Sequence, residues 1–87
     1  MPVLIRHRAE GMTPDLYDQV SPTLVEGVKQ QAGFVLHVAF VDSQGFCVAE
    51  IWDSQEQHDA WFDENVVPNV PAQITQEVVQ IHNVVSP

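Results

Sequence analysis

The sequence predicts an α+β domain of the ferredoxin-like type, with the order β-α-β-β-α-β and a four-stranded antiparallel sheet. Three observations predict this class. Four segments are apolar runs that read as strands, two segments repeat apolar residues at helical spacing, and a short turn joins the two middle strands as a hairpin. The length of 87 residues fits one small domain, so we expect residues 1–87 to form a single unit.

The first half of the chain reads as a strand followed by a helix. Val3–Ala9 is the first predicted strand, and Thr13 is a good N-cap for a helix whose first residue is Pro14. Pro22 lies inside the helical pattern, so we expect a kink there or two short helices. Gly33 is the expected C-cap. The apolar stripe of this helix consists of Tyr17, Val20, Leu24 and Val28.

A hairpin follows. Phe34–Val41 is the second predicted strand, and its alternation places Phe34 on the same face as Leu36, Val38 and Phe40. Asp42–Gly45 has the composition of a type I turn, with Asp first and Gly fourth. The third predicted strand runs from Phe46 to Trp52 and is apolar on both faces.

The second helix begins after the hairpin. Either Asp53 with Glu56 or Ser54 with Gln57 fits a capping box. The helical stripe after the cap consists of His58, Trp61, Phe62, Asn65 and Val66. We expect Pro68 and Pro71 to end this helix, and Ile74–Val85 to form the last strand.

The apolar strand faces also predict self-association. Two helices can cover only one face of a four-stranded sheet, yet the two middle strands are apolar on both sides. Soluble monomers rarely expose so large an apolar surface. We therefore expect a homodimer in which two sheets pack face to face.

Composition limits the possible partners and the location of the chain. The formal net charge is −9, with 3 Lys and Arg against 12 Asp and Glu, which argues against binding to nucleic acid or to an anionic membrane surface. The N-terminal residues do not resemble a signal peptide, and no stretch is long enough to span a membrane. Cys47 is expected to be a buried apolar residue. A cytoplasmic location is the expectation.

The strand-to-helix stretch from Gly45 to Pro68 also resembles a known family. "FCVAEIW" at Phe46–Trp52, followed by "DSQEQHDAWF", resembles the strand-to-helix signature of antibiotic biosynthesis monooxygenase-like domains of the dimeric α+β barrel superfamily. "YDQV", "LHVAF", "EIWDS" and "IHNVV" are similar to segments of small actinobacterial proteins of this fold. The resemblance implies a homodimer with a pocket between the sheet and helices of each protomer. It also implies oxygenation of an electron-rich aromatic substrate without metal or flavin.

The candidate site residues are histidines and aromatic residues. His37 and His82 are the candidate general bases, because histidine titrates near neutral pH. His82 and Asn83 point to opposite faces of the last predicted strand, so one of them would reach the pocket. His58 is expected to line the cavity or to lie at its edge. The expected apolar wall consists of Tyr17, Trp52, Trp61 and Phe62.

Structural interpretations compete with these roles. His37 can equally be a core histidine satisfied by the backbone, and His7 is expected to be solvated. Glu50 lies in an apolar strand and needs a partner, for which Arg6 and Arg8 are the candidates.

The histidines suggest two forms of cofactor binding. A metal site formed by His7, His37 and His82 is a minor alternative, because their spacing matches no ligand motif. Haem degradation is not favoured either: the haem-degrading members of the family that the chain resembles have a histidine late in the second helix region, and Val66–Ala72 contains none. We therefore expect neither metal nor cofactor.

The leading hypothesis is a cofactor-independent monooxygenase-like protein that binds a small aromatic or polyketide-like substrate. A non-catalytic small-molecule-binding or dimerisation module is the first alternative. A cofactor-independent cyclase or isomerase, which would need no oxygen, is the second.

Overall fold

The computed structural model describes residues 2–70 and 72–87 and has the predicted element order. The elements are β1 (Val3–Ala9), α1 (Pro14–Val28), β2 (Phe34–Asp42), β3 (Gly45–Trp52), α2 (Gln55–Trp61), a π-helical turn (Phe62–Val66) and β4 (Ile74–Gln80). The strands form one antiparallel sheet in the order β2-β3-β1-β4. The ferredoxin-like class is therefore confirmed.

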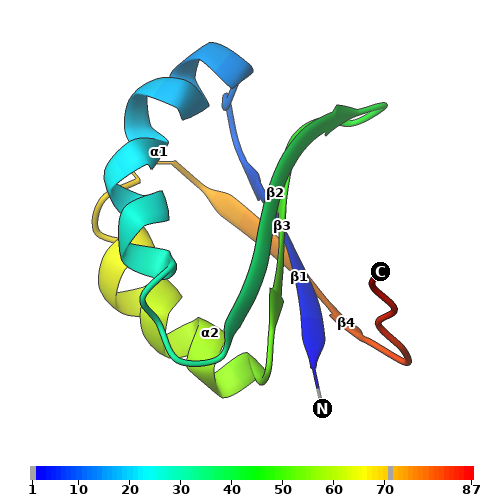
Figure 1. Cartoon of the computed structure of the whole chain (residues 1–87). Helices are drawn as coiled ribbons and strands as arrows, with labels where there is room; N and C mark the ends of the chain where they lie inside the picture. Colours follow the sequence, from blue (N-terminus) through cyan, green and yellow to red (C-terminus); the bar gives the residue numbers. More distant parts are fainter. Residues whose placement is uncertain (1, 71) are drawn as a thin grey trace.

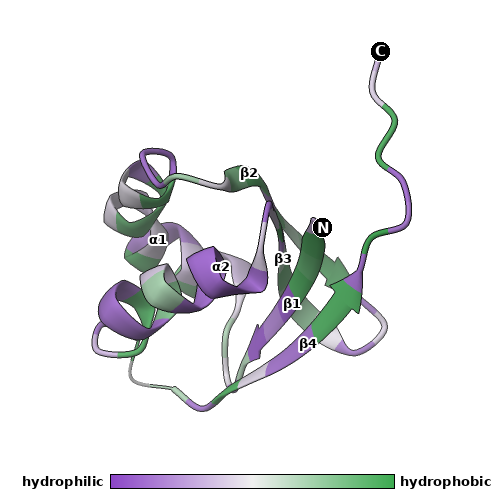
Figure 2. Cartoon of the chain, turned by 90° about the horizontal axis from the view of Figure 1, so that it is seen from below, coloured by the Kyte–Doolittle hydropathy of each residue, from purple (hydrophilic) through white to green (hydrophobic). Residues whose placement is uncertain are grey.

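Both helices lie on one face of the sheet, as Figure 1 shows. The core is formed between the helices and that face by Val3, Ile5, Val28, Trp52 and Trp61. The opposite face carries no helix, and Figure 2 shows apolar stretches in its strands. On it, Leu36, Val38 and Val79 keep 48%, 45% and 38% of their surface exposed. The sheet is thus covered on one side only, as the helix count predicted.

A β-bulge changes the face expected for Phe34. Phe34 pairs with Trp52, whereas Leu36 pairs with the adjacent Ile51, so Val35 is an extra residue in β2. Phe34 therefore points to the helix-covered face, where its ring packs edge-on against Trp52 at a centroid distance of 5.5 Å. Its predicted place beside Leu36 is wrong, because strict alternation ends at the bulge.

The helices differ from prediction in two details. α1 is one continuous helix despite Pro22. Pro22 and Asp18, whose carbonyl loses its helical donor there, are both exposed, so water can replace the missing hydrogen bond. Lys29 is the C-cap. Gly33 lies farther on, with φ +88°, and its carbonyl accepts a hydrogen bond from the Asp53 N–H at 2.8 Å, so it is a loop glycine.

The cap of α2 is the second of the two predicted alternatives. The Ser54 hydroxyl accepts the Gln57 N–H at 3.2 Å and donates to the side-chain oxygen of Gln57 at 3.0 Å. The role expected of Pro71 in ending this helix lies outside the described residues. Beyond α2, the Val67 N–H donates to the Phe62 carbonyl at 3.0 Å, which closes the π-helical turn.

The last strand is shorter than predicted. β4 ends at Gln80, which pairs with Val3, the first residue of β1. Because β1 begins at Val3, the residues after Gln80 have no part of β1 to pair with. Residues 81–87 therefore form a tail without helix or strand. The prediction that the strand continues to Val85 is therefore wrong.

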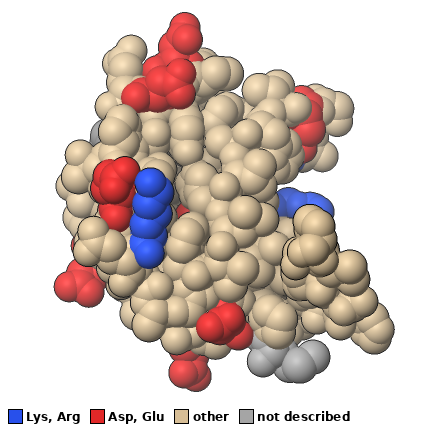
Figure 3. Space-filling model, viewed as in Figure 1, with Lys and Arg blue, Asp and Glu red and all other residues tan. Residues whose placement is uncertain are grey.

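The basic side chains are paired with acids. Arg6 contacts Glu77, Arg8 contacts Asp42 and Lys29 contacts Glu26. Arg6 and Arg8 are thus members of ion pairs at the surface. In Figure 3, acidic groups are spread over the surface in view and basic groups are few. No helix in the described part of the chain is long and apolar enough to cross a membrane.

Candidate functional site

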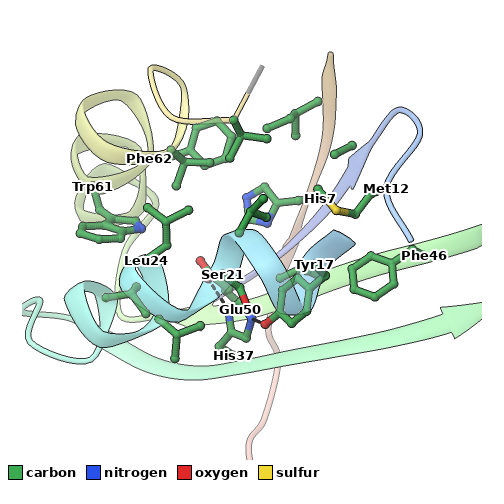
Figure 4. Close-up of a pocket in the computed structure, with 18 residues that line it drawn as sticks. His7, Met12, Tyr17, Ser21, Leu24, His37, Phe46, Glu50, Trp61 and Phe62 are labelled. Atoms are coloured by element: carbon green, nitrogen blue, oxygen red, sulfur yellow. Dashed lines mark hydrogen bonds and ion pairs between the residues drawn. The ribbon is translucent and has the colours of Figure 1, made fainter. Parts of the chain in front are cut away.

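A cavity lies between the helices and the covered face of the sheet. Its volume is about 110 Å³, it opens to solvent, and its lining is mostly apolar. The close-up in Figure 4 shows side chains from α1, the sheet and the α2 segment converging on this space. The polar side chains in the lining are His7, Tyr17, Ser21, His37 and Glu50. A few polar groups in an apolar pocket is the usual composition of a small-molecule site.

Three of these polar groups form a continuous hydrogen-bonded chain. The Tyr17 hydroxyl lies 2.6 Å from Nε2 of His37, and Nδ1 of His37 lies 2.7 Å from Oε2 of Glu50. Tyr17 comes from α1, while His37 and Glu50 are register partners on β2 and β3. Figure 4 shows the three side chains together at one wall of the cavity.

The carboxylate fixes the tautomer of His37. A carboxylate can only accept, so Nδ1 of His37 carries the hydrogen and donates it to Glu50. Nε2 then has a free lone pair, which accepts the hydroxyl hydrogen of Tyr17. His37 is therefore arranged as a base whose basic nitrogen faces the Tyr17 hydroxyl.

Glu50 is held as a carboxylate despite its burial. Only 7% of its surface is exposed, and its other oxygen accepts the indole N–H of Trp52 at 3.0 Å. Burial favours the neutral acid, but the hydrogen bonds from His37 and Trp52 and the nearby His7 lower the pKa of Glu50 below its ordinary value. Burial also raises the pKa of Tyr17, which keeps its phenol protonated at neutral pH. The hydrogen-bonded chain thus joins a phenol, an imidazole and a carboxylate.

A second polar chain lies on the other side of Glu50. Nε2 of His7 is 2.9 Å from Nε2 of His58, and Nδ1 of His58 is 2.9 Å from Asp59. The rings of His7 and Phe62 stack at a centroid distance of 5.0 Å. Burial lowers the pKa of His7 to about 4, so this imidazole is neutral at pH 7.

The structure brings together most of the site residues predicted from sequence. Tyr17, His37, Trp61 and Phe62 line the cavity. Trp52 and His58 are fully buried behind the lining, at 0% exposure, and each contacts a lining residue, Glu50 and His7 respectively.

The other predicted site residues are not brought to the cavity. His82 and Asn83 are exposed on the C-terminal tail and do not line the cavity. This placement follows from the early end of β4, since the predicted strand would have carried both residues along the sheet.

The structure corrects three further predictions from the sequence. Glu50 pairs with His37 and Trp52, whereas Arg6 or Arg8 was expected. His7 is not a solvated residue, because it lines the cavity and contacts His58. The three histidines considered as a metal set are not gathered either, since His82 lies on the tail.

Sequence reasoning missed the His37–Glu50 pair as a functional element, although a signal for it existed. Asp42 and Gly45 pair at the hairpin end, and counting back along both strands from them places His37 opposite Glu50. Apposition of a histidine and a carboxylate on a covered sheet face is a specific pattern. The contact between His7 and His58 has no comparable signal, because it joins a strand to a helix.

Several solved structures share this fold. SnoaB, a cofactor-independent oxygenase from Streptomyces nogalater, superposes with a TM-score of 0.67 at 12% identity, over 99% of this chain and 96% of that one. The haem-degrading MhuD of Mycobacterium tuberculosis, with two hemes bound in its active site, gives 0.68 at 14% identity, over 99% and 100% of the two chains.

A Streptomyces coelicolor monooxygenase in complex with nanaomycin D gives a TM-score of 0.60 at 12% identity, over 99% of this chain and 91% of that one. No protein-family model and no curated protein sequence matches the chain. The predicted likeness is therefore confirmed at the level of structure: the chain has the fold of antibiotic biosynthesis monooxygenase-like proteins.

Proposed function

We propose that this protein is a cofactor-independent monooxygenase that oxidises a small phenolic substrate in the cavity between helices and sheet. The observation that carries the proposal is the Tyr17–His37–Glu50 chain at the cavity wall. It supplies a base with an oriented lone pair, in an apolar space that an aromatic ring can enter. The fold shared with the oxygenase SnoaB supports the same class of reaction.

The Tyr17–His37–Glu50 hydrogen-bonded chain can remove the proton of the substrate phenol in one connected transfer. The substrate hydroxyl gives its proton to the Tyr17 oxygen while Tyr17 gives its own to Nε2 of His37. The carboxylate of Glu50 stabilises the imidazolium that results. The substrate is left as a phenolate, with Tyr17 donating a hydrogen bond to its oxygen.

The phenolate then reacts with molecular oxygen. A ring carbon of the substrate transfers electrons to oxygen and forms a C–O bond, which gives a hydroperoxide. Loss of water from the hydroperoxide forms a quinone. Phenol and one oxygen molecule thus give quinone and one water, with the substrate as the only reductant. The residues of the chain supply proton transfer, orientation and a dry environment.

The size of the cavity indicates the size of the substrate. A cavity of about 150 Å³ holds one benzene molecule, and this cavity of about 110 Å³ opens to solvent. It therefore suits one aromatic ring, with any further rings of a polyketide-like molecule lying outside the opening. The aromatic side chains in its lining, Phe46, Trp61 and Phe62, can stack on such a ring.

An oxygen electrode tests the proposal. EDTA-treated protein is supplied with single-ring phenols and hydroquinones, and oxygen uptake is measured together with quinone formation. We expect uptake that falls about 100-fold in His37→Gln, because glutamine cannot act as a base. His82→Ala is the matched control, because His82 was the other candidate base and lies on the exposed tail. Equal loss in both variants, or no uptake with any substrate, would reject the proposal.

The two alternatives make different predictions in the same assay. A cyclase or isomerase would convert its substrate under nitrogen, without oxygen uptake. A binding module would give ligand affinity without turnover. A non-catalytic module would have a filled cavity and histidines paired with the backbone. The open cavity and the pairing of His37 and His58 with side chains favour a ligand site.

We also propose that the protein is a homodimer formed through the uncovered sheet face. The exposed apolar side chains of Leu36, Val38 and Val79 on that face support it. Sedimentation would test the stoichiometry. A cytoplasmic location stays a prediction, which fractionation of the native host would test.

A further inference from the structure

A compact group of potential metal ligands lies beside the proposed proton-transfer chain. His7 from β1, Glu50 from β3 and His58 from α2 each offer one nitrogen or carboxylate oxygen, and these three atoms all lie within 4.8 Å of one another. Glu50 is 7% exposed and His58 is fully buried. Three separate elements therefore place three ligand-type groups at one buried point.

The tautomer of His58 directs its lone pair at His7. Nδ1 of His58 lies 2.9 Å from the Asp59 carboxylate, so this nitrogen carries the hydrogen and Nε2 does not. Nε2 of His7 is 2.9 Å from Nε2 of His58. A single hydrogen therefore lies between the two nitrogens. Two nitrogens each about 2.0–2.1 Å from one tetrahedrally coordinated ion would lie about 3.3 Å apart, so an ion can replace that hydrogen if the two imidazoles separate slightly.

The surrounding groups are those that support metal ligands. A histidine ligand commonly donates its other N–H to a carboxylate, as His58 does to Asp59, and ligating carboxylates are themselves hydrogen-bonded. Glu50 accepts hydrogen bonds from Trp52 and His37 at 3.0 and 2.7 Å. These contacts fix the orientation of two of the three groups before any ion arrives.

The arrangement leaves room for further ligands on one side. His7 and Glu50 line the cavity, whereas His58 lies behind the lining. An ion held by the three groups would therefore face the cavity with its remaining positions. Two imidazoles and a carboxylate suit zinc and iron(II) better than calcium or magnesium, which prefer oxygen ligands.

We propose that His7, Glu50 and His58 form a binding site for one divalent transition-metal ion of the zinc type, open towards the cavity. This inference does not rest on the proposed oxygenase function, which is assayed in EDTA-treated protein. It changes the expectation from sequence that the chain binds no metal, because that expectation considered His82 and did not place His58 near His7.

Metal titration of the full chain tests the site. Cobalt(II) is added to EDTA-treated and desalted protein, and visible absorption is followed; zinc is titrated by calorimetry. We expect saturable binding of one ion per chain, because the three ligand atoms converge on one point. Absence of saturable binding at one ion per chain would overturn the proposal.

Variants locate the site. Glu50→Gln keeps the shape of the side chain, and His7→Phe keeps a ring that can stack on Phe62. We expect each to weaken cobalt binding at least tenfold, whereas His82→Ala leaves it unchanged. Binding that survives in both cavity variants, or that is lost in His82→Ala, would assign the metal to another site and reject the proposal.

A measurement on the unaltered chain keeps the test independent of variant folding. Zinc is added to ¹⁵N-labelled protein, and the imidazole nitrogens of the four histidines are observed by NMR. We expect the Nε2 signals of His7 and His58 to shift while those of His82 stay in place. Shifts at His82 alone would show binding at the tail and overturn the inference.

Discussion

Gly27 of α1 lies directly against the indole ring of Trp61 of α2: a Cβ atom at position 27 would be only 2.8 Å from Cη2 of Trp61. The two helices meet at this point because residue 27 has no side chain. Trp61 is 7% exposed and belongs to the core, so its ring cannot move outward without losing buried contacts.

Gly27→Ala should therefore destabilise the protein. Overpacking of a filled core costs about 1–3 kcal/mol, whereas the same change in an unhindered helix would stabilise it by up to about 1 kcal/mol. The sign of the change in unfolding free energy, measured in urea at fixed protein concentration, decides between these cases. Thr23→Ala on the exposed side of α1 is the control and should change stability by less than about 0.5 kcal/mol. A gain in stability for the glycine variant would contradict the contact.

Glu50→Gln tests the buried hydrogen-bond network. Glutamine keeps the size of the side chain but has one acceptor oxygen, so Nδ1 of His37 and Nε1 of Trp52 can no longer both donate to it. Leaving a buried donor unpaired costs about 1–3 kcal/mol. Urea unfolding gives the value. Glu77→Gln removes an exposed carboxylate paired with Arg6 and should cost less than about 1 kcal/mol. Equal losses in the two variants would mean that Glu50 is not held as described.

His7 makes stability fall as the solution becomes acidic. Its pKa is lowered from 6.5 to about 4, first by burial and then by the neighbouring His58 and His37, against the opposing effect of Glu50. On acidification, His7 therefore binds a proton near pH 6.5 in the unfolded chain but only near pH 4 in the folded chain. His7 leaves the free energy of unfolding unchanged above pH 6.5 and lowers it between pH 6.5 and 4, by up to about 3 kcal/mol in total.

The control for this pH dependence is a change of the ring. His7→Phe, unfolded in urea at pH 7.5, 5.5 and 4.5 in the presence of EDTA, should lack most of the loss in that window. His82→Ala should keep it, because that residue is exposed on the tail. A pH slope that is the same in all three proteins would assign the effect to other groups.

Tyr17→Phe separates the relay from the base. The hydroxyl is 2.6 Å from Nε2 of His37, and Phe removes only that oxygen. If the substrate proton passes through Tyr17, oxygen uptake with phenols should fall about 100-fold while the affinity for the substrate changes little. Unchanged turnover would mean that the substrate reaches His37 directly. Val25→Ala, which trims an apolar lining residue and leaves the polar chain intact, is the control.

A sequence pattern contains information about single strands and helices. Alternation fixed which residues share a face within one strand, and helical spacing placed Tyr17, Trp61 and Phe62 on the covered side, so the fold and half of the site were predictable. Alternation holds only while the pairing is regular. The bulge at Val35 reverses the face of Phe34, and it depends on packing against Trp52 that a local pattern does not contain.

Contacts between different elements were the part that could not be predicted. His82 was a candidate base because β4 was expected to continue to Val85, but the length of β4 is limited by where β1 begins. His7 was expected in solvent because it lies between two arginines, yet its alternation with Arg6 and Arg8 turns it to the helix side. On that side it contacts His58, and this contact depends on how α2 packs against the sheet.

The uncovered sheet face gives the last prediction, Val38→Asp. Val38 is 45% exposed in a single chain and lies in the middle of β2, beside Ala49 of β3. If two copies pack face to face, a carboxylate at this position would be buried without a partner and would oppose the same group of the second copy, which costs several kcal/mol. Sedimentation should then show a monomer where the unaltered protein is a dimer. Val67→Asp is the matched control, because Val67 is 54% exposed but follows the π-helical turn in the helical layer. Dissociation by both changes, or by the control alone, would place the dimer contact on the helices and leave the apolar sheet face without its proposed partner.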